Sequence, residues 1–210
     1  MTLPSHRPLI YLISDGSITN ENCEQRSAGF LELIGAAVGF RIPLVQIREK
    51  LLSGRNLFDL ASRAVKVTRG TETRLLINDR LDVALASGSD GVHLTSTSFT
   101  TDAVRPVVPD GFLIGVSTHT ADEVENARAN SADFAVYGPV FETPGKERAA
   151  GIDKLSDVVR TSDPFPVLAL GGVDETNYRD VLETGATGFA AIRFLNDVAN
   201  LEMLSREFDL

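Results

Sequence analysis

Cysteine and long apolar runs are what this chain has least of. Cys23 is the only cysteine among 210 residues, so no disulfide can form within the chain, as is typical of proteins in a reducing compartment. No stretch approaches the roughly 20 apolar residues that a membrane-spanning helix requires. The segment from Met1 to Pro8 lacks the apolar core of a signal peptide. We therefore expect a cytoplasmic protein with no membrane partner.

Basic side chains are also scarce. The chain has 20 lysines and arginines against 29 aspartates and glutamates, which gives a net charge of −9. A protein that binds the nucleic-acid backbone needs a basic face, so we expect no nucleic-acid partner. Small phosphorylated substrates are compatible with this charge, because a few cations in a cleft can dominate the local field.

Short apolar runs alternate with segments of helical periodicity along the whole chain. The predicted strands are Leu9–Ser14, Leu44–Arg48, Arg74–Ile77, Gly91–Leu94, Phe112–Val116, Asp133–Tyr137, Pro166–Leu170 and Gly188–Ile192. Helices are predicted between them at Glu24–Val38, Leu57–Val67, Leu81–Ala86, Asp102–Val107, Ala121–Asn130, Ile152–Arg160 and Glu175–Glu183.

This alternation predicts an α/β fold with a parallel sheet, because parallel strands need helical crossovers. Eight such units in 210 residues match a compact (β/α)8 TIM barrel, and no linker or repeat divides the chain, so residues 1–210 are predicted to form a single domain. A doubly wound open sheet is the alternative, although no Gly-x-Gly-x-x-Gly segment opens a helix. A homo-oligomer built through the barrel helices is compatible with this fold, but no motif requires one.

Polar side chains gather where the second and third predicted strands end. Gln46, Arg48 and Lys50 are spaced two residues apart, so a strand would point all three to one face, where two cations and an amide could bind phosphate. A solvated edge strand would show the same alternation. Asn78 and Asp79 follow the third strand and could cap the next helix or, for Asp79, bind Mg²⁺ beside a polyphosphate.

The later strand ends offer an acid–base group and a second anion site. Ser117 and His119 share one face after the fifth strand, at the end of a barrel where catalytic groups collect. The long loop after the sixth strand contains Lys146, which could close over an anion. Gly171 and Gly172 let backbone N–H groups approach a phosphate, and Arg193 would add a cation.

Six motifs in order resemble the thiamine-phosphate synthase/TenI family over nearly the whole chain. They are Val45-Gln46-Ile47-Arg48-Glu49-Lys50, Asn78-Asp79-Arg80, Gly91-Val92-His93-Leu94, Gly115-Val116-Ser117-Thr118-His119-Thr120, Gly138-Pro139-Val140-Phe141 and Leu170-Gly171-Gly172. The resemblance implies a (β/α)8 barrel that joins hydroxymethylpyrimidine diphosphate to hydroxyethylthiazole phosphate, with Mg²⁺ and release of pyrophosphate.

The resemblance also implies roles for individual residues. The residues that would bind the pyrimidine and its diphosphate are Gln46, Arg48, Lys50 and Asn78. Asp79 would bind Mg²⁺, and Ser117 would lie near the leaving group. Thr143 and Lys146 would come from the loop, and the residues around the thiazole phosphate would be Gly172, Ile192 and Arg193.

The chain departs from the synthase pattern at two positions. Ser98 stands where the synthases usually place a second metal-binding aspartate, and Gly145 stands where a hydroxyl residue is common. Phe141-Glu142-Thr143 and Ser98-Phe99 instead resemble the TenI branch, which includes a thiazole phosphate tautomerase that needs an acid–base group and no metal. His119 matches the histidine proposed for that role. The alternatives to the synthase are therefore a tautomerase and a non-catalytic barrel that binds a thiamine precursor phosphate.

Overall fold

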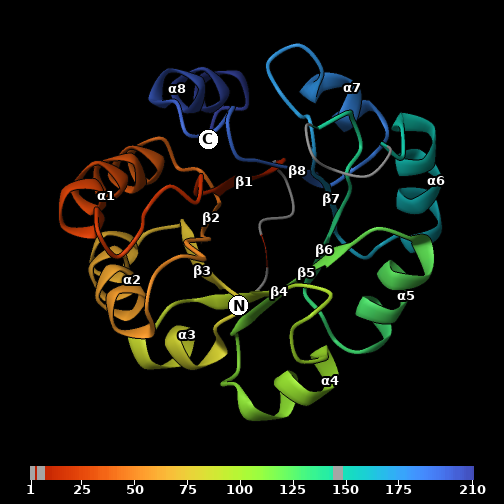
Figure 1. Cartoon of the computed structure of the whole chain (residues 1–210). Coiled ribbons are helices and arrows are strands. Elements are labelled where there is room, and N and C mark those ends of the chain that lie inside the picture. Colours follow the sequence, from red (N-terminus) through yellow and green to blue (C-terminus); the bar gives the residue numbers. More distant parts are fainter. Residues whose placement is uncertain (1–2, 4–7, 144–148) are drawn as a thin grey trace.

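Eight parallel strands close into a barrel in chain order, with β1 paired to both β2 and β8 (Figure 1). The computed structural model describes residue 3, residues 8–143 and residues 149–210. The strands are β1 (Leu9–Ile13), β2 (Leu44–Ile47), β3 (Arg74–Asn78), β4 (Gly91–Leu94), β5 (Leu113–Thr118), β6 (Phe134–Tyr137), β7 (Val167–Ala169) and β8 (Gly188–Ala191). The closed (β/α)8 barrel confirms the predicted fold and excludes the open sheet.

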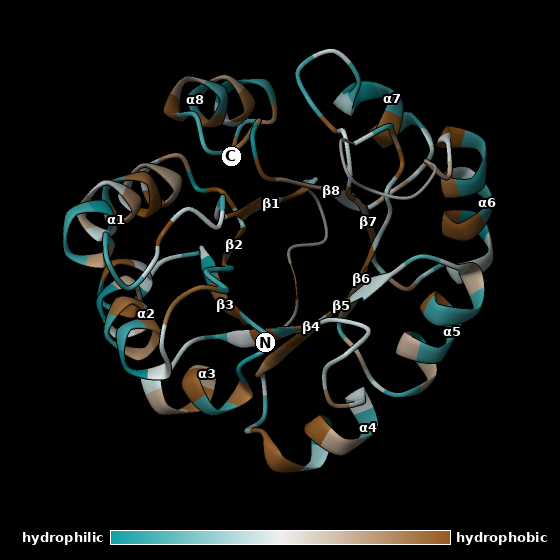
Figure 2. Ribbon diagram, viewed as in Figure 1, coloured by the Kyte–Doolittle hydropathy of each residue, from teal (hydrophilic) through white to brown (hydrophobic). Residues whose placement is uncertain are grey.

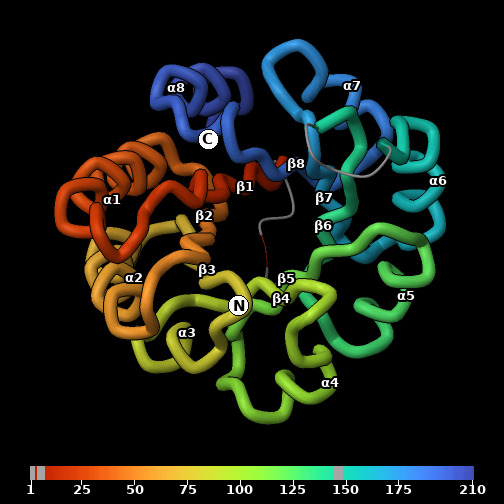
Figure 3. The backbone as a smooth tube through the Cα atoms, in the orientation of Figure 1, coloured from red at the N-terminus to blue at the C-terminus, as the bar shows by residue number. Residues whose placement is uncertain are grey.

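Helices follow each strand and surround the barrel, as the chain path in Figure 3 shows. They are α1 (Cys23–Gly39), α2 (Gly54–Thr68), α3 (Leu81–Ser87), α4 (Thr101–Val104) with the 3₁₀ turn η1 (Arg105–Val107), α5 (Ala121–Ala129), α6 (Ile152–Ser162), α7 (Tyr178–Glu183) and α8 (Val198–Glu207). No helix in the described ranges is long and apolar enough to cross a membrane. The assignment of residues 1–210 to one domain stays a prediction.

The alternation of side chains along the strands produces two apolar layers. Leu9, Tyr11 and Ile13 of β1 point into the barrel, whereas Ile10 and Leu12 pack outward against the helices. Figure 2 shows hydrophobic colour along the strands, with hydrophilic and hydrophobic segments alternating around the helices. The interior below the mouth is therefore filled with side chains, and open space for a ligand lies at the strand ends.

Three helical segments differ from the sequence-based expectation. The helix predicted after β4 stops at Val104 and continues only as a 3₁₀ turn containing Pro106, which has no N–H to donate. Helix α7 begins at Tyr178 rather than at Glu175, because the side chain of Asp174 accepts a hydrogen bond from the Thr176 N–H and holds a turn there. No residue range was predicted for helix α8, and the Asp197 side chain caps its start.

Candidate functional site

A cavity of about 400 Å³ opens at the carboxyl ends of the strands. Its lining includes eight of the predicted site residues, namely Gln46, Arg48, Lys50, Asn78, Ser117, His119, Thr143 and Ile192. These residues come from β2, β3, β5, the loop after β6 and the segment after β8. The barrel therefore brings together residues that are up to 146 positions apart in the sequence (192 − 46).

One side of the cavity is cationic and amide-rich. Strand β2 ends at Ile47, one residue earlier than predicted, so Arg48 and Lys50 follow the strand rather than belonging to it. The Arg48 N–H donates to the Ser14 hydroxyl at 2.8 Å, which keeps this segment against β1. Gln46 is buried, whereas Lys50 is exposed at the mouth. Both cations still line the cavity, as the alternation predicted.

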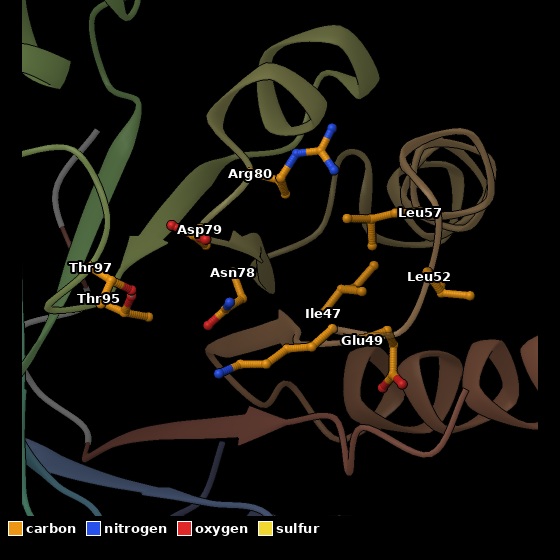
Figure 4. A pocket seen from close by; sticks show the side chains of 10 residues that line it. Ile47, Glu49, Leu52, Leu57, Asn78, Asp79, Arg80, Thr95 and Thr97 are labelled. Carbon is orange, nitrogen blue, oxygen red and sulfur yellow. The ribbon is translucent and has the colours of Figure 1, made fainter. Parts of the chain in front are cut away.

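Asn78 and Asp79 border an adjoining cavity of about 250 Å³ that shares Lys50 and Thr95 with the first (Figure 4). Figure 4 shows Asn78 and Asp79 between Ile47 and the loop residues Thr95 and Thr97. The Ser98 hydroxyl donates a hydrogen bond to the Asp79 carboxylate. The residue that replaces the expected second aspartate thus contacts the first one directly.

The alternative role of Asn78 and Asp79, capping the helix that follows them, is wrong. Helix α3 has Arg80 at its N-cap position, and no side chain caps it. Asp79 adopts a left-handed backbone conformation (φ 64°), which turns its side chain toward Ser98. Arg80 pairs with Asp82 instead. Asp79 is therefore exposed and available to a ligand at the mouth.

The donor set around Asp79 fits one kind of metal binding. No group of three or more His, Cys, Asp or Glu side chains in the described part of the chain could hold a metal ion. Asp79 and Ser98 offer one carboxylate and one hydroxyl. Mg²⁺ keeps several waters and usually takes one or two carboxylates plus substrate phosphate oxygens. These residues therefore fit Mg²⁺ that arrives with a diphosphate, not a site made by the protein alone.

The floor of the cavity contains a histidine that was not among the predicted site residues. His93 on β4 lies inside the barrel, and its Nε2 is 2.9 Å from the Ser117 hydroxyl. Its Nδ1 faces the Tyr11 hydroxyl, which accepts a hydrogen bond from Gln46. Burial, followed by the charge of Arg48, lowers the pKa of His93 to about 3. Its position between apolar neighbours in Gly91–Leu94, pointing inward by period two, was the signal available in the sequence.

His119 lies at the rim of the same cavity and is exposed. Its Nδ1 contacts the Gly138 carbonyl oxygen, and its backbone N–H donates to Glu123. A carbonyl only accepts, so Nδ1 is the protonated nitrogen. In the neutral ring Nε2 then has a lone pair, which is the arrangement of a general base.

A third cavity of about 460 Å³ lies beyond β7 and β8. It is lined by Gly172 and Arg193 and shares Thr143, Gly171 and Ile192 with the main cavity, so the two cavities adjoin. Acidic Asp174, Glu175 and Asp197 also line it, which reduces its positive charge. Lys146 lies outside the described residues.

The glycines after β7 have a packing reason as well. Gly172 has φ 68°, and an added Cβ would lie 2.7 Å from the Phe141 Cβ and 2.9 Å from the Glu142 oxygen. The backbone of the loop after β6 therefore approaches closely, and the Phe141 N–H donates to the Gly171 oxygen at 2.9 Å. This contact fixes the base of the loop that contains Thr143.

The sequence matches the family model described as thiamine monophosphate synthase over residues 10–195. The chain belongs to this family. A *Geobacter sulfurreducens* protein provisionally named thiamine-phosphate synthase is 39% identical over 189 residues, covering 87% of this chain and 84% of the relative. The thiamine-phosphate synthase of *Methanoculleus marisnigri* is 33% identical, covering 87% of this chain and 85% of the relative.

Solved structures agree with this family assignment. Thiamine phosphate pyrophosphorylase from *Pyrococcus furiosus* superposes with a TM-score of 0.80 at 26% identity, over 97% of this chain and 98% of that one. A 3-hexulose-6-phosphate synthase has 15% identity to this chain and a TM-score of 0.66, and this similarity concerns only the barrel fold. The family resemblance read from the six motifs is confirmed.

Proposed function

We propose that this protein is a thiamine-phosphate synthase, a transferase that joins hydroxymethylpyrimidine diphosphate to hydroxyethylthiazole phosphate and releases pyrophosphate. One observation supports this most strongly. The cationic, amide-rich cavity beside β2 and β3 adjoins the glycine-lined cavity beside β7 and β8, with which it shares Thr143, Gly171 and Ile192. Two small phosphorylated substrates would occupy these neighbouring cavities with their reacting groups facing each other.

The proposed reaction depends mainly on stabilising the negative charge of the leaving group. The bond between the pyrimidine methylene carbon and the diphosphate oxygen breaks, and the thiazole nitrogen supplies the electron pair for the new carbon–nitrogen bond. Negative charge develops on the departing diphosphate, so fixed cations and donors lower the barrier. Arg48 and Lys50 provide that charge, and Gln46 and Asn78 add amide groups at the same end.

Asp79, with the hydroxyl of Ser98, would hold Mg²⁺ against the diphosphate. When bound there, Mg²⁺ would supply positive charge that stabilises the departing diphosphate. The protein's part is to present the Asp79 carboxylate outward, which its left-handed backbone does.

The cavity beside β7 and β8 would receive the thiazole phosphate. Gly172 and Arg193 lie beside the predicted position of its phosphate, and Ile192 offers an apolar contact to the ring. Thr143 lines both cavities. The family resemblance implies that Lys146, which lies outside the described residues, is a further site residue of the same loop. We place this reaction in the cytoplasm, since the chain has a single cysteine.

Two observations favour a thiazole phosphate tautomerase as the second candidate. His119 has its Nδ1 fixed by a carbonyl and lines the main cavity. Ser98 provides no charge beside Asp79, which weakens the case for a metal-dependent reaction. Tautomerisation requires only that a proton leave one atom of the thiazole and return to another, and a neutral histidine suits that step.

Paired variants separate the candidates. The synthase predicts that Asp79→Ala slows pyrophosphate release steeply, and that EDTA stops it in the wild type. The tautomerase predicts that His119→Ala abolishes conversion of the carboxythiazole phosphate isomer while Asp79→Ala has little effect. His119→Asn is the matched control, because its amide keeps a donor for the Gly138 carbonyl without the ring base. Ligand binding without either turnover would favour the non-catalytic barrel.

A further inference from the structure

A row of hydrogen-bonded polar side chains crosses the barrel interior at the floor of the main cavity. It consists of Gln46, Tyr11, His93 and Ser117, which we call the polar row. Gln46 Nε2 is 2.8 Å from the Tyr11 hydroxyl, which is 3.4 Å from His93 Nδ1, and His93 Nε2 is 2.9 Å from the Ser117 hydroxyl. Tyr11, Gln46 and His93 are at most 3% exposed. Gln46, His93 and Ser117 line the cavity, and Ser117 is the most exposed of the four.

Gln46 donates a hydrogen bond to the Tyr11 hydroxyl. This bond sets the direction of every other hydrogen bond in the polar row. The Tyr11 hydroxyl has a single hydrogen, and leaving a buried donor without an acceptor is costly. His93 Nδ1 is the acceptor within reach. A neutral imidazole that accepts at Nδ1 has its hydrogen on Nε2, which then donates to Ser117.

The electrostatics of the interior agree with this direction. Burial raises the pKa of Tyr11, so its hydroxyl keeps the hydrogen. Burial and the nearby Arg48 lower the pKa of His93, so the ring has one N–H at neutral pH rather than two. A charged His93 would place a buried cation beside Arg48, and the neutral ring avoids that cost.

Packing fixes the rings in this arrangement. The Phe134 ring meets Tyr11 edge-on, with centroids 5.6 Å apart and planes at 80°. Gly115 leaves room for both rings, because a Cβ there would lie 2.8 Å from His93 Nδ1 and 2.4 Å from Phe134 Cζ. His93 therefore has little freedom to turn its ring away from Ser117.

We propose that Tyr11 and His93 are positioning residues that make the Ser117 hydroxyl a hydrogen-bond donor to the departing diphosphate. The Ser117 oxygen accepts from His93, so its own hydrogen turns toward the cavity. Phosphate oxygens are acceptors, and a hydroxyl that already accepts one hydrogen bond donates more strongly. This inference deepens the proposed synthase function and rests on it for the identity of the acceptor.

The direction of the row can be read without any substrate. The chain has three histidines, His6, His93 and His119, so ¹⁵N-histidine NMR gives few signals, and the His93→Gln variant identifies those of His93. We expect the Nε2–H tautomer of His93, since Nδ1 is the acceptor within reach of the Tyr11 hydroxyl. An Nδ1–H tautomer would overturn the proposal.

Kinetics test whether the row acts on the reaction. Tyr11→Phe removes the hydrogen that fixes His93, and we expect kcat to fall at least about tenfold with KM within about twofold, as for a group that acts in the transition state. The same variant should shift the ¹⁵N signal of His93 Nδ1, which loses its hydrogen-bond partner. Tyr178→Phe is the matched control: this buried tyrosine bonds Glu207 and lines none of the three cavities described above.

A second pair of variants separates positioning from packing. His93→Gln keeps an amide N–H near the position of Nε2, whereas the shorter side chain of His93→Asn can replace only Nδ1. We expect His93→Gln to retain more kcat than His93→Asn, and equal values would contradict the proposal, as would wild-type kcat in Tyr11→Phe. If the wild type releases no pyrophosphate, the synthase function fails, while the NMR signals still decide the direction of the row.

Discussion

The Ser98 hydroxyl donates a hydrogen bond to the carboxylate of Asp79, across the gap between the segments that follow β3 and β4. This contact stands where a second carboxylate would share a metal ion in the synthase pattern. A hydroxyl adds no negative charge, so any Mg²⁺ here depends more heavily on the diphosphate. Under the proposed function, substitutions at Asp79 and Ser98 should therefore change the affinity for Mg²⁺.

Ser98→Asp should raise the affinity for Mg²⁺. A second carboxylate beside Asp79 supplies another charged ligand, and we expect the Mg²⁺ concentration for half-maximal rate to fall by about tenfold, equivalent to about 1.4 kcal/mol. Two neighbouring carboxylates repel each other without the ion, so the melting temperature should drop in EDTA. Ser98→Asn is the isosteric neutral control. An unchanged Mg²⁺ dependence in Ser98→Asp would place the ion elsewhere.

Lys50→Ala should slow the reaction far more than it weakens binding. Its charge lies at the cavity mouth, where the proposed reaction would develop charge on the diphosphate, and loss of one such group costs about 100-fold or more in kcat. Lys66→Ala, at an exposed position of α2 outside the three cavities, controls for the general loss of one positive charge. Steady-state pyrophosphate release measures both variants. Equal rates for the two would remove Lys50 from the catalytic set.

His93 should make stability depend on pH below neutrality. Its pKa is about 3 in the folded protein and 6.5 when unperturbed, so the stability that it contributes is present above pH 6.5 and is lost as the pH falls toward 3. The slope from this one group is at most about 1.4 kcal/mol per pH unit. Urea unfolding of wild type and His93→Gln between pH 7 and 5 should show a flatter dependence in the variant. Parallel curves would mean that His93 is accessible to protons in the folded state.

Gly115→Ala should destabilise the barrel by overpacking. The new methyl group would press on His93 and Phe134, and such insertions cost about 1–3 kcal/mol. Gly35→Ala in α1 is the control, since its Cβ would meet no atom within 4 Å. That substitution should be neutral or stabilising by up to about 1 kcal/mol, because alanine favours a helix. Chemical denaturation compares the free energy of unfolding of the two variants. Equal values would show that the side chains around Gly115 move to make room for the methyl group.

Period-two spacing predicted which side chains of β2 reach the mouth, because the pleat of a strand leaves few alternatives. Gln46, Arg48 and Lys50 line one cavity although the strand ends at Ile47. Backbone conformation was harder to foresee. The left-handed turn at Asp79 opposes the preference of most residues, so a capping role looked equally reasonable from the sequence.

Contacts between distant strands lay beyond the reach of sequence patterns. Tyr11 and His93 are 82 residues apart, and only the closed barrel places them together. Each looks like an ordinary residue of an apolar strand, so neither was predicted to belong to the site. Helix α7 shows the same limit on a local scale, since the turn at Asp174 outweighs the helical pattern that begins at Glu175.

The most direct test of the account is the stoichiometry of the wild-type reaction with both substrates and Mg²⁺. Separating the products and measuring pyrophosphate in the same samples should give one thiamine phosphate for each pyrophosphate released, with no release when the thiazole phosphate is omitted. Conversion of a thiazole phosphate isomer without any pyrophosphate release would contradict the synthase and support the tautomerase.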